Sequence, residues 1–135
     1  MNSKAIKNGG WALVLLFAVG CCEPDFYRVS GVATRNGQPM EFLQITFVPD
    51  NAELVRPPIA MTDKEGKFKL TTGSIAGVKK GAYSIYIDDP ERVGGGKTST
   101  EEDYVHVITR YSAANSDLKI DVDRHMDDFQ LKLDD

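Results

Sequence analysis

Apolar and polar residues alternate with a period of two in several short stretches of the chain. The clearest is the segment IAMTDKEGKFKL at 59–70, in which Phe68 and Leu70 fall on one side and lysines on the other. This period is expected of a half-buried strand. The polar centre at 63–66 has the composition of a tight turn, because Asp can bond its own backbone and Gly accepts a positive φ. We therefore predict two short strands folded back on each other about this turn.

Similar alternation, or a strand-like composition, predicts the remaining strands, which turn residues separate. They are expected at 27–34, 41–48, 82–87, 118–122 and 129–133, with a short edge strand at 104–108. Asn36-Gly37 is a strong hairpin signal, since both residues tolerate a positive φ. No helical periodicity is recognised after the N-terminal region. About seven short strands predict an all-β fold, a single antiparallel Greek-key β-sandwich over residues 27–135.

The N-terminal segment has a different pattern, a basic start followed by an uninterrupted apolar run. Lys4 and Lys7 precede the run WALVLLFAVG at 11–20. At about 1.5 Å per residue this run is too short to span a bilayer core of about 30 Å, and it is typical of the core of a signal peptide. The sequence therefore predicts a signal peptide at residues 1–20 and export of the remaining chain.

The residues that end this segment indicate the kind of signal. Ala18-Val19-Gly20-Cys21 resembles the lipobox of bacterial lipoproteins, although that family more often has Leu in place of Ala18. The resemblance implies cleavage before Cys21, acylation of Cys21, a lipidated tether at 21–26, and a membrane-anchored protein of the cell envelope that faces the periplasm or the exterior. The alternative is a plain secretory signal, which leaves Cys21 to pair with Cys22, a bridge that adjacent cysteines form only with strain.

Cleavage would change the charge of the protein. The whole chain has 16 basic and 20 acidic residues, and loss of Lys4 and Lys7 leaves 14 basic residues and a formal charge near −6. Such a charge opposes binding to nucleic acid. The expected partners are the membrane, through the lipid anchor, and an unidentified envelope protein or glycan.

Short motifs along the chain resemble those of carboxypeptidase regulatory-like domains, which have a transthyretin-like sandwich. In order they are VSGV at 29–32, NGQP at 36–39, ITFVP at 45–49, TDKEGKF at 62–68 and KGAYSI at 80–85. The part from 107 to the end resembles small planctomycete-type envelope lipoproteins that consist of one such domain, with Thr109 where those proteins usually carry Pro. The resemblance implies a tethered β-sandwich without catalytic activity or cofactor.

Three tyrosines form the candidate ligand site. Tyr86 lies on the polar side of the predicted strand 82–87, and Tyr104 and Tyr111 follow the long irregular stretch 88–103. Tyrosine rings present flat apolar faces with a polar tip, so they can stack on sugars. The alternative function is therefore a carbohydrate-binding module at the cell surface that uses these three rings, and the structural alternative is that they pack in the core.

Other patterns match functional sites less well. GGGKT at 94–98 ends like a phosphate-binding loop, but Glu91 occupies a position that needs Gly. Two histidines, His106 and His125, are too few for a zinc site, and no metal site is expected. The acidic clusters do not match the spacing of a calcium loop and are expected to be solvated; they lie at 88–91, 101–103 and 121–128.

The enzyme alternative comes from a hydrolase of 5-hydroxyisourate, which shares the transthyretin-like architecture. That family ends in Tyr-Arg-Gly-Ser, whereas this chain ends in Leu133-Asp134-Asp135. No segment has the nucleophile-elbow pattern of a serine hydrolase. We therefore expect no catalytic residues and a structural or binding role.

Overall fold

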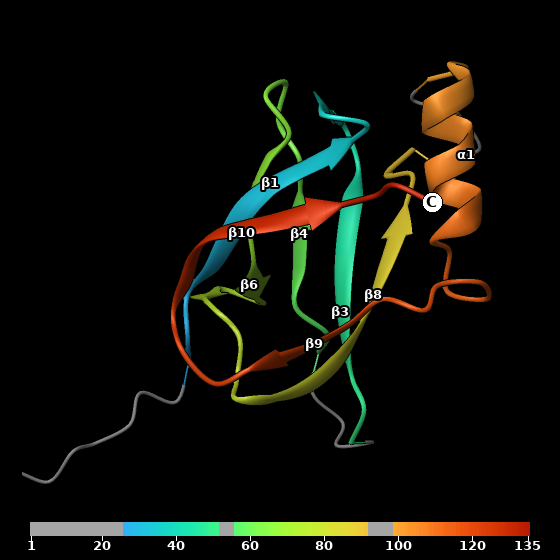
Figure 1. The fold of residues 1–135 in the computed structure, drawn as a ribbon. Helices are drawn as coiled ribbons and strands as arrows, with labels where there is room; N and C mark the ends of the chain where they lie inside the picture. The colour runs from blue at the N-terminus through green and yellow to red at the C-terminus, as the bar shows by residue number, and fades with distance from the viewer. Residues whose placement is uncertain (1–25, 52–55, 92–98) are drawn as a thin grey trace, which may run out of the picture.

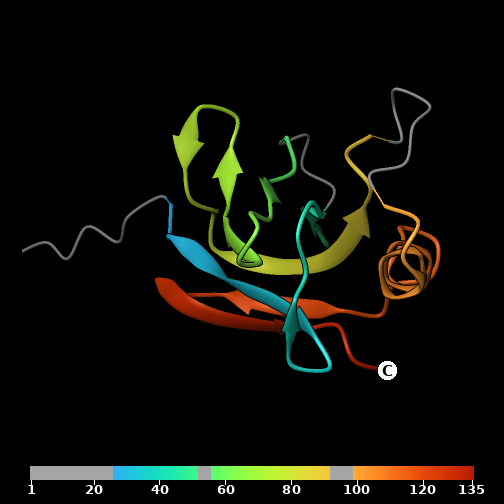
Figure 2. The same cartoon turned by 90° about the horizontal axis from the view of Figure 1, so that it is seen from above.

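Two β-sheets and one helix make up the part of the chain that the computed structural model describes, residues 26–51, 56–91 and 99–135 (Figures 1 and 2). The β1 sheet contains β10 (Met126–Lys132), β1 (Val29–Arg35), β2 (Gln38–Pro39) and, also beside β1, β5 (Lys67–Lys69). The β3 sheet contains, in order, β7 (Ile75–Ala76), β6 (Thr71–Thr72), β4 (Ile59–Met61), β3 (Gln44–Pro49), β8 (Gly81–Asp88) and β9 (Lys119–Val122). The all-β sandwich prediction is confirmed.

The core lies between the inner faces of the two sheets. Alternate residues of β3 and of the approach to it point inward, and Leu43, Ile45 and Phe47 are fully buried, as the alternation predicts. The β1 sheet contributes the apolar side chains that pack opposite them, among which Phe68 and Leu131 are buried. Removing this apolar surface from water supplies the main favourable free energy of folding.

The turn at 63–66 forms as predicted. The Asp63 carboxylate oxygen Oδ1 accepts hydrogen bonds from the backbone N–H groups of Glu65, at 2.8 Å, and Lys67, at 2.9 Å. Gly66 has a φ of 73°, and its N–H donates to the Asp63 carbonyl at 3.0 Å. The expectation that the two flanking strands pair with each other is wrong, because β4 pairs with β3 and β5 pairs with β1. The turn therefore joins the two sheets.

The segment expected as an edge strand at 104–108 is instead part of a helix, α1 (Glu102–Arg110). Glu102 in its first turn and Arg110 in its last complement the helix macrodipole. Tyr104, Val107 and Tyr111 have the spacing of one helical face and are buried. Tyr104, Val107, Ile108 and Tyr111 repeat at i, i+3, i+4 and i+7, so the helical pattern is present in the sequence and the strand expectation missed it.

Among the strands of the described residues, β1 pairs in parallel with β10, so the expectation of a purely antiparallel fold is wrong there. The register places Gly31 opposite Phe129 and is irregular between Val29 and Gly31. A Cβ on Gly31 would lie 1.8 Å from the Phe129 carbonyl oxygen. Only glycine fits at this crossing, and its use is to let two backbones approach.

The ten strands of the described residues exceed the seven expected because three of them have only two residues. These are β2, which pairs with β1, β6, which pairs with β4, and β7, which pairs with β6. Such short pairings produce no readable alternation in sequence.

Gly66 and Gly73 provide a matched test of the turn. Both have a positive φ, but a Cβ on Gly66 would lie 2.6 Å from the Ala33 carbonyl oxygen, whereas a Cβ on Gly73 would have nothing within 4 Å. Gly73→Ala should lower the free energy of unfolding by about 1 kcal/mol. Gly66→Ala adds steric conflict and should lower it by about 2 kcal/mol or more. Urea unfolding measures both, and equal losses would contradict the close approach to Ala33.

Candidate functional site

At the N-terminal end of the described residues, an isolated backbone bridge holds the chain against the rest of the fold. Tyr27 and Val78 exchange two N–H to carbonyl hydrogen bonds, each 2.8 Å long. Gly77 comes directly before Val78 with a φ of 115°, and a Cβ there would lie 2.7 Å from the Tyr27 carbonyl oxygen. The bridge therefore fixes the start of the domain beside the segment that leads into β8. We call the region around Tyr27, Val78 and the residues that lead into β8 the tether end.

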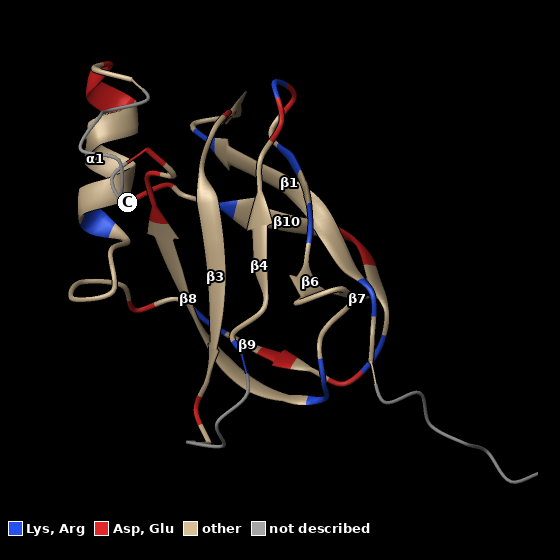
Figure 3. Cartoon of the chain, turned by 180° about the vertical axis from the view of Figure 1, so that it is seen from behind, with Lys and Arg blue, Asp and Glu red and all other residues tan. Residues whose placement is uncertain are grey.

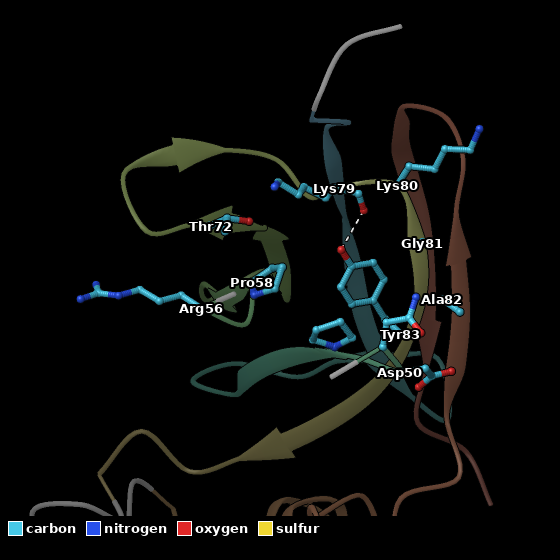
Figure 4. A pocket seen from close by; sticks show the side chains of 11 residues that line it. Asp50, Arg56, Pro58, Thr72, Lys79, Lys80, Gly81, Ala82 and Tyr83 are labelled. Carbon is cyan, nitrogen blue, oxygen red and sulfur yellow. Dashed lines mark hydrogen bonds between the residues drawn. The ribbon is translucent and has the colours of Figure 1, made fainter. Parts of the chain in front are cut away.

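A cleft of about 220 Å³ opens at the tether end (Figure 4). The Tyr83 ring forms one wall, and its hydroxyl donates a hydrogen bond to the Lys79 carbonyl at 2.8 Å. Burial raises the pKa of the Tyr83 hydroxyl above its ordinary value. The lining combines apolar, polar and charged residues, namely Pro49, Asp50, Asn51, Arg56, Pro58, Thr72, Lys79, Lys80, Gly81, Ala82 and Tyr83.

Cationic side chains stand at the rim of this cleft and not in its interior. Arg56, Lys79 and Lys80 are exposed, and the side chains of Arg56 and Lys80 extend away from the Tyr83 ring (Figure 4). Lys79 Nζ lies 5.8 Å from the centroid of the Phe26 ring, which is within cation–π range. A cleft with an apolar wall and a cationic rim suits a ligand or surface that carries negative charge.

The acidic residue of the cleft is already partnered. Ser84 Oγ donates a hydrogen bond to Asp50 Oδ1 at 3.0 Å, and Lys119 Nζ lies 3.9 Å from Asp50 Oδ2. These contacts offset the negative charge of Asp50.

A second candidate surface is the outer face of the β3 sheet. The strand register aligns Thr71, Ile59, Thr46 and Tyr86 in one row across β6, β4, β3 and β8. Ile59 is 44% exposed, and Met61, two residues further along β4, is 55% exposed. This face is a mixed surface of aliphatic, hydroxyl and aromatic groups.

Only one of the three candidate tyrosines lies on that face. Tyr86 is half-buried there, whereas Tyr104 and Tyr111 are 4% and 2% exposed. The Tyr104 hydroxyl donates to the Phe42 carbonyl at 2.8 Å, and the Tyr111 hydroxyl donates to the Asp134 carbonyl at 2.7 Å. The expected platform of three exposed rings does not form, because helical spacing turns Tyr104 and Tyr111 into the core. Carbohydrate binding stays a prediction that depends on Tyr86.

The residues around His106 form a cluster that holds the C-terminus. His106 Nε2 lies 2.8 Å from Asp135 Oδ1. The Arg35 guanidinium donates from Nε to Asp103 Oδ1 at 2.9 Å and from Nη1 to the Leu133 carbonyl at 3.0 Å. Arg35 thus links β1, α1 and the end of the chain, a role that the sequence did not indicate because its partners are remote. We call this group the C-terminal clamp.

The second histidine also has a structural contact. His125 Nδ1 accepts a hydrogen bond from the Arg28 backbone N–H at 3.0 Å, and its ring packs edge-on against Tyr27, with centroids 5.4 Å apart. No three His, Cys, Asp or Glu side chains of the described residues are grouped so as to hold a metal ion.

Several predicted features lie outside the described residues. Cys21, Cys22 and the GGGKT segment at 94–98 are among them. Within the described ranges, no helix has the length and apolar character needed to cross a membrane.

Comparison with known proteins does not assign a family to this fold and these surfaces. The chain matches no protein-family model, no curated protein and no solved structure. The resemblance to carboxypeptidase regulatory-like domains and to planctomycete-type lipoproteins stays a prediction from the motifs.

The tyrosine placements generate a stability prediction. Tyr104→Phe and Tyr111→Phe each leave a carbonyl without the hydroxyl that now bonds to it, and each should lower the free energy of unfolding by about 1 kcal/mol. Tyr86→Phe is the control and should change it by less than about 0.5 kcal/mol. Urea unfolding measures all three, and a loss in Tyr86→Phe as large as in the others would contradict these placements.

The C-terminal clamp generates a pH prediction. The hydrogen bond with His106, followed by the contact with Arg35, lowers the pKa of Asp135 below its ordinary value. Because the folded-state pKa is the lower one, the stabilisation is complete above the unfolded value of about 3.9 and is lost as the pH falls through the folded value.

Asp135→Asn should therefore unfold with a shallower dependence on pH below about pH 4 than the wild type does. Thermal unfolding between pH 2 and 7, in steps of about one unit, measures the difference. Asp128→Asn, which changes the net charge equally outside the clamp, is the control. Identical pH profiles for the wild type and Asp135→Asn would show that this carboxylate contributes nothing.

Proposed function

We propose that the protein is a lipid-anchored protein of the cell envelope whose β-sandwich has a binding or structural role without catalysis. The observation that carries the proposal is the short distance in sequence between the predicted acylation site, Cys21, and Tyr27, the first of the described residues that pairs with another part of the fold. A basic start and an apolar core precede that cysteine, as in exported proteins.

The shape of the domain supports an anchored role. β1 begins at the tether end, while the turn at 63–66 and the first turn of α1 lie at the opposite end (Figures 1 and 3). A lipid attached to Cys21 would hold one end of the sandwich at the membrane. The opposite end and the sides of the sandwich would then face the surrounding compartment, which is the periplasm or the exterior.

The outer face of the β3 sheet is the surface that we assign to partner binding. Ile59 and Met61 place exposed apolar groups beside the hydroxyl groups of Thr46 and Tyr86. Protein interfaces combine apolar and aromatic groups of this kind with scattered hydrogen-bonding groups. The partner is therefore expected to be an envelope protein that covers this face.

Acylation of Cys21 is the direct test. Metabolic labelling with a palmitate analogue should mark the wild-type protein, and Cys21→Ser should lose the mark because the attachment site is gone. Cys22→Ser is the matched control and should keep it. Labelling that survives Cys21→Ser and disappears in Cys22→Ser would move the site by one residue, and an unlabelled wild type would overturn the lipid anchor.

A further inference from the structure

We propose that the outer face of the β3 sheet is the contact between two copies of this chain, which stand side by side on the membrane about a two-fold axis parallel to β3. The inference rests on the proposed lipid anchor at Cys21 and on the assignment of this face to partner binding. It names the envelope protein that covers the face as a second copy of the chain.

The outer face is almost free of charge, as a contact between two identical surfaces requires. The outward side chains of β6, β4, β3 and β8 are hydroxyl, amide, aliphatic and aromatic groups, with Asp88 as the exception. Asp88 lies at the end of β8, where its Oδ1 accepts a hydrogen bond from the Asp89 N–H at 2.9 Å. A two-fold axis brings like residues together, so a face of one sign of charge would repel its own copy. In a chain with a formal charge near −6 after cleavage, an uncharged face is the surface suited to self-association.

The strand register makes this face self-complementary. Thr46 lies on β3 with Ile59 of β4 on one side of it and Tyr86 of β8 on the other. A two-fold axis along β3 places Thr46 opposite its own copy and β4 opposite β8 of the second copy. Ile59, which is 44% exposed, then packs on the Tyr86 ring of the second copy, and the symmetry repeats the contact. Each such contact removes apolar and aromatic surface from water.

The same axis is compatible with two anchors in one bilayer. β3 ends at Pro49, which lines the cleft at the tether end, whereas β4 leads into the turn at 63–66 at the opposite end (Figure 1). Rotation about an axis along these strands leaves both tether ends at the same end of the dimer. Cys21 of each copy can therefore hold its domain in the same membrane.

The size of the face indicates that the anchor contributes to the contact. Four strands about 4.8 Å apart, over six residues that each rise about 3.3 Å, cover about 400 Å² of each copy, or about 800 Å² in the pair. Stable complexes bury about 1,200 Å² or more, so this contact is weak between freely diffusing copies. Anchored copies share a thin layer at the membrane, and their higher effective concentration offsets the weak contact.

The test cross-links the full-length acylated protein in its native membrane through a cysteine on the two-fold axis. Thr46→Cys in a Cys22→Ser background should give a covalent dimer with a short bismaleimide, because the axis places position 46 opposite its own copy. Gln130→Cys, which is exposed on β10 in the other sheet, is the control and should give no dimer.

A charge placed on the face tests the contact itself. Ile59→Asp in the Thr46→Cys protein should lower the yield of dimer about tenfold or more, because a carboxylate would be buried against the second copy without a partner. Ile75→Asp is the matched control and should leave the yield unchanged. Ile75 is similarly exposed, at 47%, but its register with Thr72 places it on the opposite side of the sheet.

The outcomes separate the contact from the anchor. No dimer from Thr46→Cys, in protein that palmitate labelling shows to be anchored, would overturn the contact and leave the anchor standing. Equal yields from Ile59→Asp and Ile75→Asp would also overturn the contact. A dimer from the Cys22→Ser parent would reveal a free thiol at Cys21, and would overturn the anchor on which the membrane-dependent contact rests.

Discussion

The parallel pairing of β1 with β10 is the constraint on which the rest of the sandwich depends. β1 is the central strand of its sheet, with β10 on one side and β2 and β5 on the other. Without β10, the backbone groups on one side of β1 would lose their partners, and unsatisfied buried backbone groups are strongly destabilising. Gly31 makes the pairing possible, because no side chain fits between its backbone and the Phe129 carbonyl.

The C-terminal clamp extends this pairing beyond the sheet. Leu133 follows β10, is fully buried, and donates its N–H to the Thr34 carbonyl at 2.7 Å. Arg35 then holds the Leu133 carbonyl and the Asp103 carboxylate at once. Through this one guanidinium, α1 is attached to the β1 sheet as well as to β8. The helix therefore closes the open side of the sandwich near the C-terminus and does not stand apart from it.

The features that could be predicted from the sequence are those set by neighbours along the chain. The burial of Ile45 and Phe47 follows from alternation, and the turn at 63–66 follows from the local bonding of Asp63 and the positive φ of Gly66. The assignment of β4 and β5 to different sheets was not predictable, because alternation gives a strand's faces but not its partner. At 104–111 the apolar residues already have helical spacing, so α1 could have been predicted, and the strand-forming residues of this segment suggested the wrong element.

The candidate surfaces also differ in how far the sequence could predict them. Tyr86 could be placed on the outer face because its strand alternates clearly. The cationic rim could not be found, since the approach of Lys79 to Phe26 depends on a bridge between Tyr27 and Val78, about fifty residues apart in the sequence. The C-terminal clamp is still less local, with Arg35 and Asp103 separated by 68 residues.

The pairing of the first long strand with the last also sets the order in which the protein can fold. The Arg28 N–H meets its His125 acceptor across 97 residues of chain, so the β1 sheet cannot be completed until nearly the whole chain is free to fold. Contacts of such long range form slowly, because the entropy of closing the loop is lost before the contact is gained. If the chain is exported in an extended state, as we propose, this delay is an advantage. The proposed export would then leave the sandwich open until the chain has crossed, because the fold is completed only when its last strand is present.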